Sequence, residues 1–143
     1  MEKETIVDNQ RVKTERKLKK MFGHIDYRNP PELCTIRDVL SLSSDKWSIL
    51  IILYLGYFPV LRFNKIKKYV YGISNKVLSE RLKTLESNGY LHRKMYAEVP
   101  IRVEYSLTAF GQDYVAKLIE MTKWMQENNP VILANKDKFQ IKG

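Results

Sequence analysis

A segment expected to be helical carries polar side chains that could bind the base edges and phosphates of DNA. Its apolar residues Leu78, Leu82 and Leu85 share one face at helical spacing. Four polar residues then lie on the opposite face, with Asn75 at its rim: Lys76, Ser79, Glu80 and Lys83. Lysine can bind phosphate or guanine acceptors, serine either backbone or base, and glutamate can accept a hydrogen bond from cytosine. The alternative is an ordinary solvated face, because exposed helices are rich in Lys and Glu.

The positive charge of the chain is concentrated around this segment. The net charge is +9, and residues 62–105 contribute ten Lys or Arg and only four Glu. Basic surfaces attract phosphate backbones, anionic lipids or acidic proteins. A basic segment precedes the helix and a basic hairpin follows it, which favours DNA. The predicted DNA-binding residues are Lys65, Lys68, Ser74, Asn75, Lys76, Ser79, Glu80, Lys83, Arg93, Lys94 and Arg102.

Cys34 is the single cysteine, so no internal disulfide or all-cysteine metal cage can form, and a reducing compartment is indicated. It stands one residue before Thr35, which we expect to cap a helix, with Arg37 one turn away. The helix dipole and the arginine both favour the reactive thiolate. The alternative is structural, because a small apolar residue before a cap commonly packs on the fourth helical residue, here Val39.

Four helices and a hairpin are expected to position these residues. A short helix begins at the Thr35 cap, and an apolar helix covering residues 47–55 begins after a Ser44 cap. A third helix at residues 62–70 ends before Gly72, and a fourth begins after a Ser74 cap and ends at Gly89. Helix, tight turn and helix followed by a two-stranded hairpin is the order of a winged helix-turn-helix.

The hairpin is indicated by a change to alternating polarity after Gly89. Its first strand alternates from Leu91 to Tyr96, and residues 97–100 form the tip. The inward residues of the return strand are Ile101, Val103, Tyr105 and Leu107. A long last helix follows a Thr108 cap, with the apolar stripe Phe110, Tyr114, Leu118, Met121 and Met125. The predicted class is mainly α (α+β), a winged helix-turn-helix with a two-stranded wing and a long C-terminal dimerisation helix.

Several short motifs in this order resemble the HxlR-type winged-helix regulators of bacteria, over about residues 33–128. The motifs are Cys34, Asp45-Lys46-Trp47, Arg62-Phe63-Asn64, Gly72-Ile73-Ser74, Arg81-Leu82, Leu85-Glu86, Gly89-Tyr90-Leu91 and Val103-Glu104-Tyr105-Ser106-Leu107-Thr108 through Gly111. The resemblance implies a homodimeric transcription factor, related in fold to MarR-type regulators, that reads a near-palindromic operator in double-stranded DNA. It also implies that several members respond to electrophiles or oxidants through a cysteine at the position of Cys34.

Dimerisation through the first and last helices is a further implication of the resemblance. The last helix also has more apolar residues than one core face needs, which points the same way. The predicted interface residues are Ile36, Leu40, Val115, Leu118, Ile119, Met121, Trp124 and Met125.

The ends depart from the family pattern. We expect a polar, basic leader at residues 1–32, bounded by Pro30 and Pro31, a domain at residues 33–129 and a tail at residues 130–143. Residues 11–20 hold six Lys or Arg and one Glu, which favours a solvated helix or frayed tail over a DNA-binding arm. Neither a secretory signal nor a membrane span is indicated, so we expect a cytoplasmic protein without a membrane partner.

An enzyme is not expected. His24 and His92 are the only histidines and lie far apart in sequence, and no nucleophile-elbow, P-loop or dinucleotide motif is present. We therefore predict no catalytic residue, no metal and no cofactor. Two other readings stay open beside DNA binding: a winged-helix module that binds protein, whose affinity would be insensitive to salt, and a regulator with a small-ligand pocket at a dimer interface.

Overall fold

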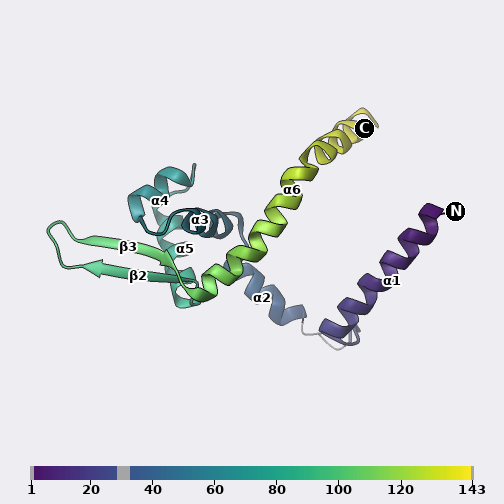
Figure 1. The fold of residues 1–143 in the computed structure, drawn as a ribbon, viewed down its shortest axis with the longest axis horizontal. Helices are drawn as coiled ribbons and strands as arrows, with labels where there is room; N and C mark the ends of the chain where they lie inside the picture. The colour runs from purple at the N-terminus through teal and green to yellow at the C-terminus, as the bar shows by residue number, and fades with distance from the viewer. Residues whose placement is uncertain (1, 29–32, 143) are drawn as a thin grey trace. The chain divides into compact units, whose positions relative to one another are not determined.

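The computed structural model describes residues 2–28 and 33–142, with the backbone alone at residues 33–35 and 42. The chain divides into two units, Met1–Leu42 and Ser43–Gly143. The first holds helix α1 (Glu2–Phe22) and nearly all of helix α2 (Leu33–Ser43). The second holds the remaining helices and the sheet (Figure 1).

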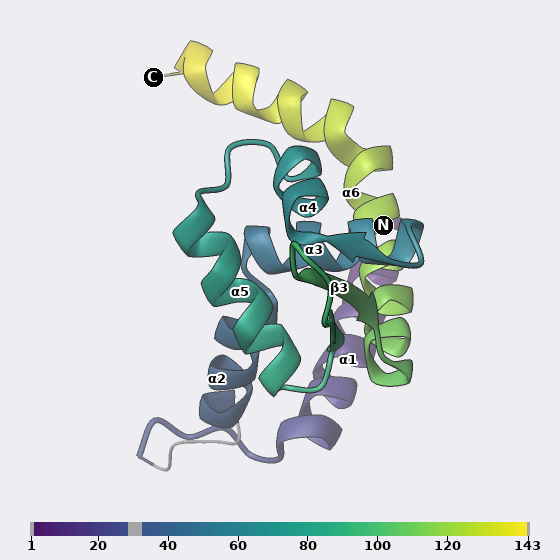
Figure 2. The same cartoon turned by 90° about the vertical axis from the view of Figure 1, so that its left-hand side faces the viewer.

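Helix α3 (Lys46–Tyr57) forms the centre of the second unit. Its side chains Ile51, Ile52 and Leu55 are fully buried, as its apolar sequence predicts. Asp45 is the N-cap, because its carboxylate accepts a hydrogen bond from the Ser48 amide. The prediction of a Ser44 cap was therefore wrong by one residue. Figure 2 shows α3 crossing the middle of this unit, with α5 on one side and α6 on the other.

Helices α4 (Phe63–Tyr69) and α5 (Asn75–Ser87) form the helix-turn-helix. Gly72 has a φ of +87° in the turn between them, a conformation that favours glycine. Ser74 caps α5 as predicted, because its hydroxyl accepts a hydrogen bond of 3.1 Å from the Val77 amide. The predicted stripe Leu78, Leu82 and Leu85 is buried. The polar residues between these leucines must therefore face outward.

The wing consists of strands β2 (Leu91–Tyr96) and β3 (Arg102–Leu107), which pair antiparallel, with Leu91 opposite Leu107. A short strand β1 (Leu61–Arg62), which the sequence pattern missed, pairs with β3 and gives the sheet order β1-β3-β2. Of the four return-strand residues predicted to face inward, only Tyr105 is buried, and Ile101 is exposed. The hairpin projects beyond the core, so both faces of its outer half meet solvent (Figure 1).

Helix α6 (Ala109–Lys142) begins after Thr108, whose hydroxyl accepts a hydrogen bond from the Gly111 amide, and continues through Pro130. Its core face is Gly111, Val115 and Leu118. The predicted core stripe was thus wrong in part. Phe110, Met121 and Met125 are exposed, and Val115, which is not part of the predicted stripe, is buried.

The first unit differs from expectation at the start of α2. This helix begins at Leu33, so Thr35 lies inside it and is not its N-cap. No side chain of α1 is buried. Across the residues that the structure describes, no helix is both long and apolar enough to cross a membrane. The fold is mostly helical with a small antiparallel sheet, which confirms the predicted winged helix-turn-helix with its long C-terminal helix.

The close approach of α6 to the wing predicts a strict requirement for glycine at position 111. A Cβ there would collide with the carbonyl oxygen of Tyr90 and press on Leu107. Gly111→Ala should therefore lower the free energy of unfolding by about 1–3 kcal/mol, although alanine favours helix. Urea unfolding measures this. Gln112→Ala, at an exposed neighbouring position, is the control, and a Gly111→Ala variant as stable as the wild type contradicts this packing.

Candidate nucleic-acid interface

The exposed face of α5 carries the residues that the sequence pattern singled out. Opposite the buried leucines, the structure exposes Lys76, Ser79, Glu80 and Lys83, together with Ser74 and Asn75 at the N-terminus of the helix. The Ser74 hydroxyl is engaged by its own helix through the cap. Its role is thus to fix where α5 begins. The side chains that remain available to a ligand are Asn75, Lys76, Ser79, Glu80 and Lys83.

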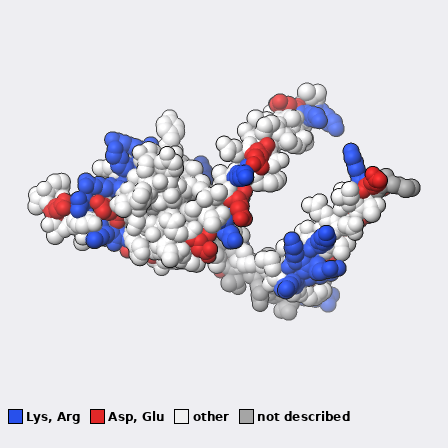
Figure 3. All heavy atoms as spheres, in the orientation of Figure 1, with Lys and Arg blue, Asp and Glu red and all other residues white. Residues whose placement is uncertain are grey.

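The wing contributes to the same surface. A cavity of about 380 Å³ is lined by α5 and by both long strands, through Ser79, Lys83, Glu86, Arg93 and Tyr105, with Phe63 of α4 completing the wall. Residues far apart in sequence therefore meet at one hollow. Figure 3 shows Lys and Arg side chains gathered over the part of this unit that holds α4 and the hairpin.

The three lysines of α4 differ in their burial and contacts. Lys67 is half-buried, and its ammonium donates a hydrogen bond of 3.4 Å to the carbonyl oxygen of Ile73, which holds the turn before α5. Lys65 and Lys68 are exposed. Only these two can contact an external anion.

The cations of this surface keep their charge available. Among the described residues, none of six forms an ion pair with a carboxylate: Lys65, Lys68, Lys76, Lys83, Arg93 and Lys94. Arg102 differs. Its guanidinium lies 3.3 Å from Glu98 and 3.5 Å from Glu104, and it stacks over the Tyr96 ring at 3.9 Å. Its predicted contact with DNA stays a prediction, and these two nearby carboxylates compete with a phosphate for its guanidinium.

An ion pair that the sequence analysis missed anchors α5. The guanidinium Nε of Arg81 donates a hydrogen bond of 2.8 Å to the carboxylate of Asp45, which also caps α3. Each side chain is about one third exposed. One carboxylate thus ties the groove-facing helix to the central helix. The sequence did contain a signal for this ion pair, because Asp45 and Arg81 both belong to the motifs that resemble HxlR-type regulators.

The pKa of Asp45 is lowered. Partial burial acts in the opposite direction and is the largest single influence, but the hydrogen bonds from Ser48 and Arg81 and the positive charge of Arg81 together outweigh it. The carboxylate is therefore charged at neutral pH, and the ion pair is intact there.

The predicted dimer-interface residues fall into two groups. Val115 and Leu118 are buried in the core of the second unit, so they present little surface to a partner. Ile36 is half-buried, and the others are exposed: Leu40, Ile119, Met121, Trp124 and Met125. The side chain of Cys34 lies outside the described part of the chain, although its backbone belongs to the first turn of α2.

A helix-turn-helix with a cationic outer face and a two-stranded wing defines the winged helix-turn-helix class of regulators. The model of the family "HxlR-like helix-turn-helix" matches residues 42–132. The chain belongs to this family, and it is a transcriptional regulator with a helix-turn-helix domain rather than an enzyme.

Similar proteins agree with this assignment. The chain is 36% identical over 107 residues to an uncharacterized HTH-type transcriptional regulator, YtfH, of Escherichia coli (strain K12), which covers 75% of this chain and 84% of that protein. The structure of the redox regulator HypR in its reduced form matches with a TM-score of 0.63 and 30% identity, over 70% of this chain and 98% of that one. Diamide-treated YodB from B. subtilis matches with a TM-score of 0.55 and 34% identity, over 65% and 91%.

The ion pair predicts a dependence of stability on pH. Asn caps helices as well as Asp does, so Asp45→Asn removes mainly the charge and should lower the free energy of unfolding by about 1 kcal/mol at pH 7. Because the pKa of Asp45 is lowered in the folded state, the unfolded chain takes up the proton first as the pH falls.

The advantage of the wild type should therefore be complete at neutral pH, begin to fall at about pH 4, the usual pKa of an unfolded aspartate, and be lost as the pH falls through the lower pKa of Asp45 in the folded protein. Urea unfolding of both proteins between neutral and acidic pH measures the difference. Asp137→Asn, at an exposed position near the end of α6, serves as the control. A constant difference across the pH range rules out the ion pair as its source.

Proposed function

We propose that this protein binds double-stranded DNA sequence-specifically, with α5 in the major groove and the wing on the flanking backbone. The observation that carries the proposal is that the surface of α4, α5 and the wing presents six cations that have no carboxylate partner among the described residues. Two of them, Lys83 and Arg93, line the hollow between α5 and the wing. Opposite charge supplies most of the affinity for a phosphate backbone. Ser79, Glu80 and the two lysines of α5 are chemically able to distinguish bases. We propose that the protein binds DNA in the cytoplasm.

Lys76→Ala and Lys83→Ala should weaken binding to an operator selected from random duplex DNA. A lysine that contacts a base should contribute about 1–3 kcal/mol, and its loss should relax specificity, whereas loss of a phosphate contact weakens binding to all sequences alike. Fluorescence anisotropy at several salt concentrations measures both effects. Lys117→Ala, on the exposed face of α6, is the matched control. Unchanged affinity in both α5 variants removes α5 from the interface, and a salt-independent affinity favours a protein partner instead.

We propose further that the protein acts as a homodimer on a near-palindromic operator. The support comes from α6, which has 34 residues but buries only Gly111, Val115 and Leu118 within its own protomer. Ile119 and Trp124 remain 53% and 59% exposed, and the relatives belong to a family of regulators. In a symmetric dimer a two-fold axis relates the two copies of α5, as it relates the two half-sites of a near-palindromic operator.

Ile119→Glu/Trp124→Glu should convert the dimer into a monomer. Both side chains are exposed in the protomer, so the substitutions leave its core intact, but a stable interface excludes unpaired carboxylates. Sedimentation equilibrium measures the mass, and circular dichroism reports whether the fold is retained. Glu120→Gln is the control on the same helix. A wild type that sediments as a monomer at micromolar concentration contradicts the proposal.

We also propose that Cys34 makes DNA binding responsive to electrophiles or oxidants. Its backbone lies in the first turn of α2, where the helix dipole favours a thiolate. The structures similar to this chain include the redox regulator HypR and diamide-treated YodB. With a single cysteine in the chain, the chemistry open to it is an adduct, a mixed disulfide or a link between two Cys34 residues of a dimer.

Diamide or a quinone should change the operator affinity of the wild type and not that of Cys34→Ser, while the two reduced proteins bind equally. Operator titrations with and without oxidant measure the change, and mass spectrometry identifies the adduct on Cys34. An equal response of the Ser variant, or resistance of Cys34 to alkylation in the native protein, assigns this residue a structural role.

A further inference from the structure

Helix α1 is a feature that the winged unit does not explain. It extends over 21 residues with no buried side chain, and it precedes the region that the family model matches, residues 42–132. Helices in proteins gain most of their stability from packing, and α1 buries no side chain, so its whole surface is accessible to a partner. The charge pattern of α1 indicates what that partner is.

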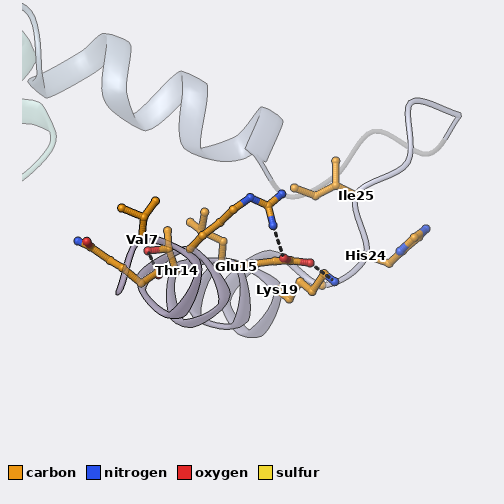
Figure 4. A pocket seen from close by; sticks show the side chains of 10 residues that line it. Val7, Thr14, Glu15, Lys19, His24 and Ile25 are labelled. Atoms are coloured by element: carbon orange, nitrogen blue, oxygen red, sulfur yellow. Dashed lines mark hydrogen bonds and ion pairs between the residues drawn. The ribbon is translucent and has the colours of Figure 1, made fainter. Parts of the chain in front are cut away.

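On one face of α1, positive and negative charges neutralise each other. The carboxylate of Glu15 lies 3.3 Å from the guanidinium of Arg11 and 2.7 Å from the ammonium of Lys19 (Figure 4). The hydrogen bond from Lys19 and the charges of both partners lower the pKa of Glu15, so it is ionised at neutral pH. Two of the six cations of residues 11–20 are therefore paired within the helix.

The other four cations form the opposite face, which we call the basic stripe: Lys13, Arg16, Lys17 and Lys20. At about 100° per residue they fall within an arc of about 100°, centred roughly opposite Glu15. All four are exposed, and none has an ion-pair partner within the described residues. The stripe extends about 10 Å along the helix axis and contains no acidic residue.

We propose that the basic stripe binds the phosphate backbone of DNA next to the site bound by the winged unit, an inference that rests on the proposed function. Four unpaired cations on one helix face complement a row of phosphates. Each of the four side chains can pair with a phosphate whatever the local base sequence. A merely solvated helix would not explain why the paired charges lie on one face and the four unpaired cations on the other.

The connection to the winged unit makes a weak contact effective. Ten residues, 23–32, join α1 to α2, and covalent geometry limits their span to about 35 Å. Helix α2, whose 11 residues rise about 16 Å, then leads into the winged unit. A tethered stripe therefore experiences phosphates at a high effective concentration once the winged unit is bound.

A membrane surface fits α1 less well than DNA does. A helix that lies in a membrane interface inserts a continuous apolar face, usually with Trp, Phe or Leu. In α1, the side that holds Val7 and Leu18 also carries the charged group of Arg11, Glu15 and Lys19, which together line one hollow (Figure 4). Burying that group among lipid chains is unfavourable.

The experiment compares three variants of the full chain with the wild type on a random-sequence DNA duplex of about 30 base pairs, long enough for two half-sites and their flanks. Lys13→Gln/Lys17→Gln removes two charges of the stripe. Arg11→Gln/Lys19→Gln removes two charges from the same helix on the other face and is the matched control. Lys13→Arg/Lys17→Arg keeps the stripe charged. Circular dichroism verifies that all three remain helical.

The stripe variant should reduce the steepness of log affinity against log salt by about 1.8 for each bound protomer, and so by about 3.6 for a homodimer, because two phosphate contacts are lost in each protomer. Binding should weaken roughly tenfold or more near 0.1 M salt. The Arg variant should match the wild type, and the control variant should change neither quantity. On a selected operator, the ratio of specific to random affinity should stay constant in the stripe variant, because phosphates carry no sequence information.

Equal losses in the stripe and control variants, or no loss in either, overturn the proposal. So does loss of binding to vesicles containing phosphatidylserine without a change in the DNA slope, which assigns the stripe to membranes. These outcomes are distinct from failure of the proposed function, which appears as the absence of any selected operator for the wild type.

Discussion

The packing of three leucines on the central helix governs the arrangement of the molecule. Leu78, Leu82 and Leu85 are buried, and this fixes the rotation of α5 about its own axis. Once that rotation is fixed, Lys76 and Lys83 can only face solvent. Apolar burial is non-directional, so it sets which face is inside but not where the helix lies along its axis. The Asp45–Arg81 ion pair and the Ser74 cap supply that missing restraint.

The polar contacts of Lys67, Ser74 and Arg81 fix the position of α5 and contribute little to the free energy of unfolding. Lys67 holds the turn before it, Ser74 sets its first residue, and Arg81 joins it to the cap of α3. Partly exposed contacts of this kind contribute little free energy each, but they are directional. A helix that must read base edges needs this precision, because hydrogen bonds to a base tolerate only small displacements.

Periodicity in the sequence was sufficient to predict the helix-turn-helix and its outer face. The leucine stripe, the Ser74 cap and the glycine after α4 are local signals, and local signals determine where helices begin, end and face. Features that leave no periodic signal in the sequence were missed. Strand β1 has two residues and no periodicity, and the pairing of Arg102 with Glu98 and Glu104 depends on the geometry of the hairpin.

The last helix shows why the same reasoning was less accurate there. It has apolar residues on several faces, so periodicity alone could not decide which face is inside. The decision came from Gly111, which lets the helix approach the Tyr90 carbonyl and thereby turns Val115 and Leu118 inward. The steric requirement at Gly111, rather than the number of apolar residues, therefore determines which face of α6 is buried.

The short buried section of α6 has a consequence for how the protein responds to its own abundance. Its outer turns, with Ile132 and Phe139 still exposed, receive no packing energy from the core of their protomer. Their order therefore depends by mass action on whatever covers them. If that is a second copy, folding of these turns and assembly become one equilibrium, and dilution of the regulator in a growing cell loosens both together.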